Sequence, residues 1–158
     1  MPLTRDAVLV QLSSGYGHFL VQAAVEVGCT VYGVEATHAM CEASAGIAYS
    51  ASLQTGASMG AVIFEQASSC TGLVRRELVS LADLVIVDNR SFGPAGNREL
   101  FESVLLSLKH GAALIATAEF LGGGPLAWYH LPHKQGFLFV RTFFCLSCRK
   151  GSRFVPDS

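Results

Sequence analysis

Five short apolar runs, separated by segments with helical spacing, constrain the fold more than any other feature of this sequence. The runs cover residues 7–12, 30–35, 61–64, 84–89 and 112–117. Continuous apolar runs without polar alternation are typical of parallel strands that are covered on both faces. Strands that alternate with helices predict a doubly wound, mostly parallel α/β sheet with right-handed crossovers.

Four segments are predicted as helices. The first follows the SSGYG turn and should end at Gly28, with a buried face made of Phe19, Leu20, Ala23, Ala24 and Val27. Residues 36–55 and 72–82 form the second and third predicted helices. The fourth is expected to begin with Asn97 as its cap and to end at Gly111.

The last part of the chain is predicted to add a pair of antiparallel strands to this sheet. The segments LAWYHL and GFLFVRTFF, joined by Pro132 to Gln135, have the composition of a strand pair. We therefore expect a C-terminal antiparallel hairpin, followed by a frayed tail from Cys148 onward. Residues 1–158 are expected to form a single domain, which is either free-standing or the truncated catalytic core of a larger protein.

Composition and charge exclude several classes of protein. Apolar residues make up 51% of the 158 residues and charged residues 15%, against roughly 25% charged in typical domains. No apolar run reaches the roughly 18 residues of a membrane span. A net charge of -1 offers no positive field for nucleic acid, so we expect direct nucleic-acid binding to be weak at best. The low charged fraction favours a homo-oligomer, a partner that covers the surface, or a domain of a larger protein.

Cysteine usage indicates a reduced, intracellular protein. Five scattered cysteines do not make a disulfide framework, and residues 1–6 lack the hydrophobic core of a signal peptide. Cys145 and Cys148 form a C-x-x-C pair, which is half of a zinc site. The other candidate ligands, His130 and His133, precede the final strand, so we predict an ordinary strand end and no metal site.

Ligands of open α/β sheets bind outside the carboxyl ends of the strands. Gly15 and Gly17 follow the first strand, where they let backbone N–H groups approach a ligand, although any tight turn into a helix can need glycine. Glu35 ends the second strand and can accept hydrogen bonds from both ribose hydroxyls of a nucleoside, or be a solvated strand-end carboxylate. Leu20 stands where a dinucleotide fingerprint has its third glycine, which argues against a pyrophosphate ligand.

Two further strand ends carry polar residues. Asp88 and Asn89 end the fourth strand and Phe92 follows, so polar groups that can orient an amine stand beside an aromatic face that favours a sulfonium or ammonium cation. The alternative is a Gly-Pro loop with a buried phenylalanine. Ser69 follows the third strand, where a hydroxyl can bond the exocyclic amine of a base, but serine is also a common loop residue.

Successive blocks of the sequence resemble the disruptor-of-telomeric-silencing family of histone lysine methyltransferases. The blocks are VLVQLSSGYGHFLVQAA, YGVE and LVIVDNRSFGP, with KHGAALIAT after the next helix, and the likeness covers residues 7–120. It implies a Rossmann-like, class I domain that binds S-adenosylmethionine, yields S-adenosylhomocysteine and methylates a lysine of a nucleosomal core histone. It also implies a nuclear location, with histones or the nucleosome as partner.

The resemblance further implies roles for individual residues. The cofactor-binding positions are Gln11, Ser13, Gly15, Gly17, Glu35 and Ser69. Glu35 corresponds to the ribose-binding acid. The catalytic positions are Asp88, which takes the place of the family's active-site asparagine, Asn89 beside it, and Phe92 as a wall of the lysine channel.

Several positions depart from the family pattern. Gln11 replaces an acid, Ser13 a glycine and Asp88 an asparagine, and Arg90 replaces an aromatic residue and could pair with Asp88. The chain also begins almost at its first strand, without the N-terminal region that completes the family's active site. These departures leave open a catalytically degenerate module that binds a protein partner. A small-molecule methyltransferase is a further alternative, and Leu20 disfavours a nicotinamide oxidoreductase.

Overall fold

A computed structural model describes residues 3–67, 75–118, 128–129 and 138–142, and its strands form one sheet in the order β3-β2-β1-β4-β5-β7-β6. The first five strands are all parallel, as the alternating pattern predicts. They are β1 (Val8–Leu12), β2 (Thr30–Glu35), β3 (Val62–Gln66), β4 (Leu84–Val87) and β5 (Ala113–Ala116). The helices are α1 (His18–Glu26), α2 (His38–Thr55), the short 3-10 helix η1 (Gly56–Ser58), α3 (Arg76–Leu81) and α4 (Pro94–Leu105).

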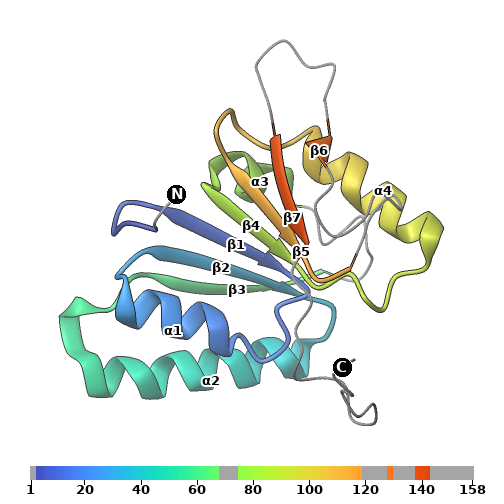
Figure 1. Ribbon diagram of the computed structural model, residues 1–158. Helices are drawn as coiled ribbons and strands as arrows, with labels where there is room; N and C mark the ends of the chain where they lie inside the picture. Colours follow the sequence, from blue (N-terminus) through green and yellow to red (C-terminus); the bar gives the residue numbers. More distant parts are fainter. Residues whose placement is uncertain (1–2, 68–74, 119–127, 130–137, 143–158) are drawn as a thin grey trace, which may run out of the picture.

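The helices cover both faces of the sheet, and the direction of winding reverses between β1 and β4. Helices α1 and α2 lie on one face, and α3 and α4 lie on the other (Figure 1). Strand β1 pairs with β2 on one side and with β4 on the other. The loops that follow β1 and β4 therefore leave the sheet toward opposite faces, which is the arrangement that opens a ligand crevice in α/β proteins.

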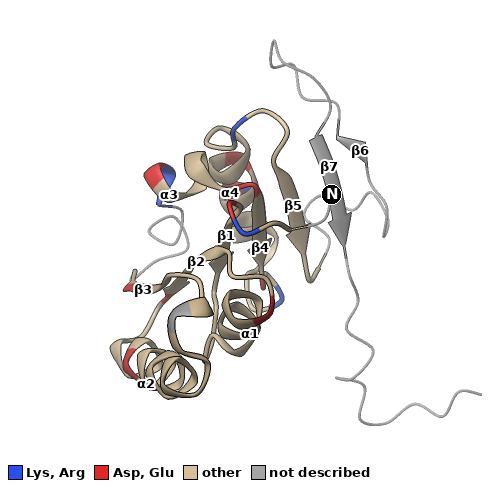
Figure 2. Ribbon diagram, turned by 90° about the vertical axis from the view of Figure 1, so that its left-hand side faces the viewer, with Lys and Arg blue, Asp and Glu red and all other residues tan. Residues whose placement is uncertain are grey.

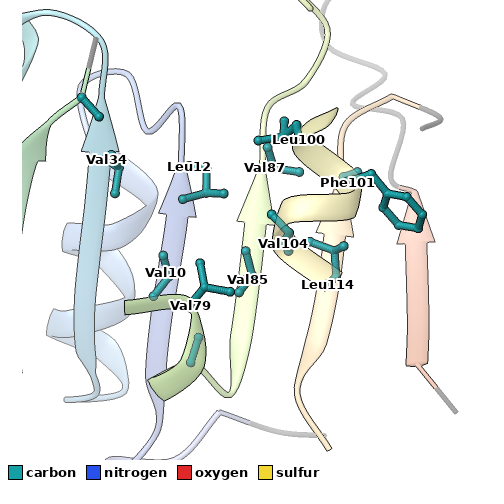
Figure 3. Packing of buried hydrophobic residues seen from close by; sticks show 13 residues of the cluster. Val10, Leu12, Val34, Val79, Val85, Val87, Leu100, Phe101, Val104 and Leu114 are labelled. Carbon is teal, nitrogen blue, oxygen red and sulfur yellow. The ribbon is translucent and has the colours of Figure 1, made fainter. Parts of the chain in front are cut away.

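The larger hydrophobic cluster lies between the sheet and helices α3 and α4. Figure 3 shows Val10 and Leu12 of β1 pointing toward this layer, together with Val85 of β4 and Leu100 and Val104 of α4. These five side chains are completely buried. Burial of a Val or Leu side chain contributes about 1.5–3 kcal/mol, so this layer holds α4 firmly against the strands whose ends carry the candidate site.

The smaller hydrophobic cluster lies on the opposite face, where leucine, valine, alanine and cysteine side chains pack between the sheet and α1. Helix α1 buries Leu20, Val21, Ala23 and Ala24, and the positive φ of Gly28 follows its end as predicted. Phe19 was expected on this buried face, but it is 49% exposed. The prediction for Phe19 is wrong because the buried face runs through Leu20, Ala23 and Ala24, and Phe19 lies one position before it.

Helix α4 corrects two predicted boundaries. Asn97 was expected to cap this helix, but the helix begins at Pro94 with Gly93 as its cap, and Asn97 lies inside the first turns. Proline suits the first helical position because its missing N–H would have no partner there. The helix also ends at Leu105 rather than at Gly111, whose φ of 81° belongs to the turn that enters β5.

The described part of the C-terminal region consists of two strands. Strand β7 (Leu138–Thr142) pairs parallel to β5, and β6 (Trp128–Tyr129) pairs antiparallel to β7. The residues between β6 and β7, the tail from Cys148 and the candidate zinc ligands lie outside the described residues, so the hairpin, the fraying and the absence of zinc stay predictions. Within the described ranges, none of the helices has the length and hydropathy that crossing a bilayer requires.

Candidate functional site

The turn after β1 folds back over the end of β2. The backbone N–H groups of Ser13 and Ser14 donate to the carbonyl oxygen of Val34 at 2.9 and 3.2 Å. Ser13, Gly15 and Gly17 adopt φ values of 60°, 59° and 67°. Three left-handed residues within five positions produce a tight turn, and the turn delivers the chain directly into the N-terminus of α1.

The two glycines of the turn serve different purposes. A Cβ atom at Gly17 would lie 2.3 Å from Cζ of Phe64, so glycine is needed for the turn to pack against that ring. Phe64 also lies against Gly33 of β2, where an added Cβ would come within 2.4 Å of the ring. A Cβ at Gly15 would meet no atom of the described structure within 4 Å. Gly15 therefore faces open space, as expected of a backbone that a ligand approaches.

Glu35, the last residue of β2, lies beside this turn. Its residue exposure is 5%, its Oε1 accepts a hydrogen bond from the N–H of Gly15 at 2.9 Å, and its Oε2 accepts one from the N–H of Ala36 at 3.1 Å. A carboxylate has about four acceptor positions, so two more bonds can be accepted. Glu35 thus fixes the turn and retains capacity for a ligand with hydroxyl groups.

Two buried polar atoms beside the turn have no partner among the described residues. They are Oε1 of Gln11 and Oγ of Ser14. Gln11 stands opposite Gly33 in the β1–β2 register, and the Ser14 oxygen would lie 2.8 Å from a Cβ placed on Gly33, so both belong to the same stretch of the strand ends. An unpaired buried polar group costs about 1–3 kcal/mol, so each calls for a water or a ligand group as partner.

Ser44 of α2 contacts the turn through its side chain. Sequence reasoning did not identify this residue. It is completely buried, and its hydroxyl lies 2.7 Å from the carbonyl oxygen of Met40 and 3.1 Å from that of Gly15. Every residue of α2 is described, and Ser44 is the one that is buried. Nothing in the local sequence distinguishes Ser44 from the other serines of this helix.

Asp88 follows β4 and forms an ion pair with Arg90. Nε of Arg90 donates to Oδ1 of Asp88 at 2.8 Å, and Nη2 approaches Oδ2 at 2.5 Å. Hydrogen bonds from Arg90 first, and from the hydroxyl of Thr117 as well, lower the pKa of Asp88 to about 2. Asp88 is therefore ionised at neutral pH and is a weak proton acceptor.

Asn89 is completely buried and forms a network of hydrogen bonds. Its Nδ2 donates to Oδ1 of Asn97 and to the carbonyl oxygen of Ala118, both at 3.0 Å, and its Oδ1 accepts from the N–H of Ala118 at 2.8 Å. Nδ2 of Asn97 donates to the carbonyl oxygen of Phe92 at 3.1 Å. The Phe92 side chain is partly buried against the larger cluster. Asn89 thus joins the loop after β4 to α4 and to the end of β5.

The structure brings most of the predicted site residues together. The N–H of Asp88 donates to the carbonyl oxygen of Leu12 at 3.3 Å, so the loop after β4 lies directly beside the turn after β1. Ser13, Gly15 and Gly17 form that turn, Glu35 bonds to it, and Gln11 precedes it in β1. Asp88, Asn89 and Phe92 belong to the neighbouring loop. Ser69 lies outside the described residues. Sequence reasoning missed Ser44, Phe64, Asn97 as a network member, and Thr117.

Charge is sparse around this site. Figure 2 shows that α1 and α2 carry few charged residues, with Glu42 as the acid of α2. Because Arg90 is paired with Asp88, the buried carboxylate of Glu35 leaves an excess of negative charge at the described strand ends. Strand ends with this charge favour a ligand that carries a positive charge.

Comparisons with known proteins identify the family of the chain. The family described as "Histone methylation protein DOT1" matches residues 1–124. A relative named "Histone-lysine N-methyltransferase, H3 lysine-79 specific" from Aspergillus fumigatus is 30% identical over 132 residues, which cover 77% of this chain and 25% of that protein. A protein of the same name from Yarrowia lipolytica is 28% identical over 131 residues, covering 81% and 26%. The chain thus spans about a quarter of the length of these curated relatives.

Solved structures show the same fold. An RNA methyltransferase from Salinibacter ruber, in complex with S-adenosyl-L-homocysteine, superposes with a TM-score of 0.61 at 21% identity, covering 81% of this chain and 76% of that one. An arsenic(III) S-adenosylmethionine methyltransferase from Chlamydomonas reinhardtii gives 0.58 at 25% identity, covering 72% and 39%. The family match over residues 1–124 and the fold lead to one conclusion: the chain belongs to the DOT1 family of histone methylation proteins.

Proposed function

We propose that this chain is a histone lysine methyltransferase domain that uses S-adenosylmethionine and acts on histone H3 in the nucleus. The family membership supports the reaction, and the relatives named "H3 lysine-79 specific" support the substrate. The observation that carries the proposal is the buried carboxylate of Glu35, which is bonded to the open Gly15 turn at the point where the sheet reverses its winding.

The residues of the turn fit S-adenosylmethionine. Glu35 has free acceptor positions for the two ribose hydroxyls, and Gly15 leaves room for close backbone approach. The unpartnered Oε1 of Gln11 can accept a hydrogen bond from the amino group of the methionine part. When it is bound, this cofactor supplies an electrophilic methyl group on a sulfonium, and the excess negative charge of the strand ends suits that cation.

The loop after β4 forms the acceptor side of the proposed site. Asp88 is ionised at neutral pH, so it orients the lysine amine through an accepted hydrogen bond and does not remove its proton. Phe92 contributes an apolar wall, and Asn89 holds the loop in place. Methyl transfer needs little beyond a neutral amine held in line with the sulfonium and shielded from water.

A second candidate function is a non-catalytic module that keeps the fold and binds a protein partner. It is favoured by the ion pair between Arg90 and Asp88, because a paired carboxylate has less capacity to orient an amine. The low charged fraction of 15% also suits a surface covered by a partner or a second copy. Both functions can share the same cofactor pocket, so methyl transfer itself has to distinguish them.

The test is methyl transfer from labelled S-adenosylmethionine to reconstituted nucleosomes and to free histone H3. We expect label on H3 with the wild-type chain, and a loss of about 100-fold with Glu35→Gln, which weakens the ribose contacts. Glu26→Gln is the matched control, because Glu26 is an exposed acid of α1 that accepts a hydrogen bond from Gln22 within the same helix. Cofactor binding without any label on either acceptor would support the non-catalytic module instead.

A further inference from the structure

Thr117 lies directly after β5, and its hydroxyl stands between two groups of the loop after β4. It donates to Oδ1 of Asp88 at 2.7 Å and accepts from the N–H of Asn89 at 3.2 Å. A hydroxyl has one proton to donate and lone pairs to accept. Thr117 therefore satisfies both of these groups at once, which a side chain without a hydroxyl cannot do.

The ion pair of Asp88 cannot fix the loop by itself. Arg90 lies two residues further along the same loop, so the Asp88–Arg90 pair is a contact within the loop and does not reach the sheet. Thr117 directly follows β5, and the last residue of that strand, Ala116, is completely buried. Its hydroxyl thus ties the Asp88 side chain to the sheet, and the carboxylate points in a direction that the sheet sets.

The Thr117 contacts lie next to the Asn89 network. The side chain of Asn89 joins Ala118 and Asn97, and the N–H of Phe92 donates to the carbonyl oxygen of Asn89 at 3.3 Å. The loop is therefore attached to β5 through Thr117 and Ala118, and to α4 through Asn97. Of these contacts, those of Thr117 are the ones that reach Asp88.

We propose that Thr117 is a positioning residue for methyl transfer, and that its hydroxyl sets the direction of the Asp88 carboxylate and the path of residues 88–92. This inference rests on the proposed function, because it concerns the acceptor side of that site. Misplacement of a reacting group by about 1 Å can cost about 100-fold in rate. The hydroxyl contributes by holding the loop in one arrangement before the acceptor arrives.

The test compares Thr117→Val, which keeps the shape and loses both hydrogen bonds, with Thr117→Ser, which keeps both. We expect Thr117→Val to lower kcat on nucleosomes about 10-fold or more while the Kd for S-adenosylmethionine changes less than about 2-fold, because the Gly15 turn is untouched. Amide hydrogen exchange at Asn89 should become faster in Thr117→Val. Thr117→Ser should restore both kcat and exchange.

Thr55→Val is the matched control, because Thr55 donates a similar hydrogen bond to the carbonyl oxygen of Ala51 within α2, away from this loop. It should leave kcat and the exchange at Asn89 unchanged. Equal kcat and equal exchange in Thr117→Val and the wild type would overturn the inference, and so would a Thr117→Ser variant as impaired as Thr117→Val. If the wild-type chain transfers no methyl group, the proposed function fails, and unchanged exchange at Asn89 in Thr117→Val then overturns the positioning role as well.

Discussion

At the scale of single residues, the turn after β1 requires an unusual backbone conformation at Ser13. Ser13 has a φ of 60° and is the one non-glycine residue with positive φ in the described part of the chain. The left-handed region costs a residue with a Cβ about 1–2 kcal/mol. Glycine stands at this position in the family that the sequence resembles, so the turn keeps a glycine's conformation with a serine in place.

Replacing Ser13 by glycine tests this strain. Ser13→Gly should stabilise the protein by about 1 kcal/mol or less, because relief of the left-handed strain is partly offset by the greater freedom of glycine in the unfolded chain. The melting temperature should rise by about 2–4 °C. Ser13→Val, which adds a β-branched side chain at the same φ, should lower it, and a stabilising Ser13→Val would contradict the account.

The free energy of unfolding should depend on pH in the acid range because the pKa of Asp88 is lowered in the folded protein. Its folded pKa of about 2 lies below the ordinary value of 3.8, so the ionised form is favoured in the folded protein. This contribution is present above the unfolded pKa and is lost as the pH falls from about 4 to 2. Since the side chain is 32% exposed, it amounts to about 1 kcal/mol after solvent screening.

The corresponding measurement is urea unfolding at pH 5 and pH 2. Asp88→Asn should be less stable than the wild type at pH 5 by about that amount, and the difference should shrink at pH 2. Asp83, whose pKa is also lowered, chiefly by Lys109, contributes to acid sensitivity in both proteins and cancels in the comparison. An equal difference at both pH values would show that Asp88 contributes nothing through its charge.

At the scale of elements, the turn between β1 and α1 depends on a side chain from a distant strand. Phe64 of β3 fills the space that Gly17 and Gly33 leave empty. The sequence predicted the glycines and the helix after them, because both signals are local. It could not predict Phe64 as their partner, because that contact depends on the strand order, which places β3 beyond β2.

Alanine at the two glycines of the turn should have separable effects. Gly17→Ala combines left-handed strain with a clash against the Phe64 ring and should cost about 2–4 kcal/mol in unfolding free energy. Gly15→Ala has the strain without the clash and should cost about 1–2 kcal/mol, and it places a methyl group in the open space where we propose that the cofactor binds. Chemical denaturation of both variants checks this order, and equal costs would contradict it.

The limits of sequence reasoning are visible in the loop after β4. Residues 84–89 were predicted as strand, but β4 ends at Val87, because Asp88 and Asn89 bond to Thr117, Ala118 and Asn97. Asn97 was predicted as a helix cap because asparagine is a good capping residue. The prediction was wrong because its amide instead joins a hydrogen-bond network, which forms only when β4, β5 and α4 are packed together.

For the whole molecule, the alternation of apolar strands and helices was sufficient to predict the parallel sheet, and the candidate site residues follow the carboxyl ends of its strands, where the sequence placed them. Glu35 was predictable because an acid at the end of the second strand must lie beside the turn after the first. The exposure of Phe19 and the burial of Ser44 could not be predicted, because both depend on how α1 and α2 pack against the sheet.

The central claim is that the Gly15 turn and Glu35 hold S-adenosylmethionine, and calorimetric titration of this cofactor into the purified chain tests it most directly. The account predicts binding with a Kd of about 1 μM to 100 μM, weakened about 10- to 100-fold in Glu35→Ala, with circular dichroism to check that the variant is folded. Glu26→Ala should bind as the wild type does. No binding at millimolar cofactor, or equal binding by wild type and Glu35→Ala, would contradict the claim.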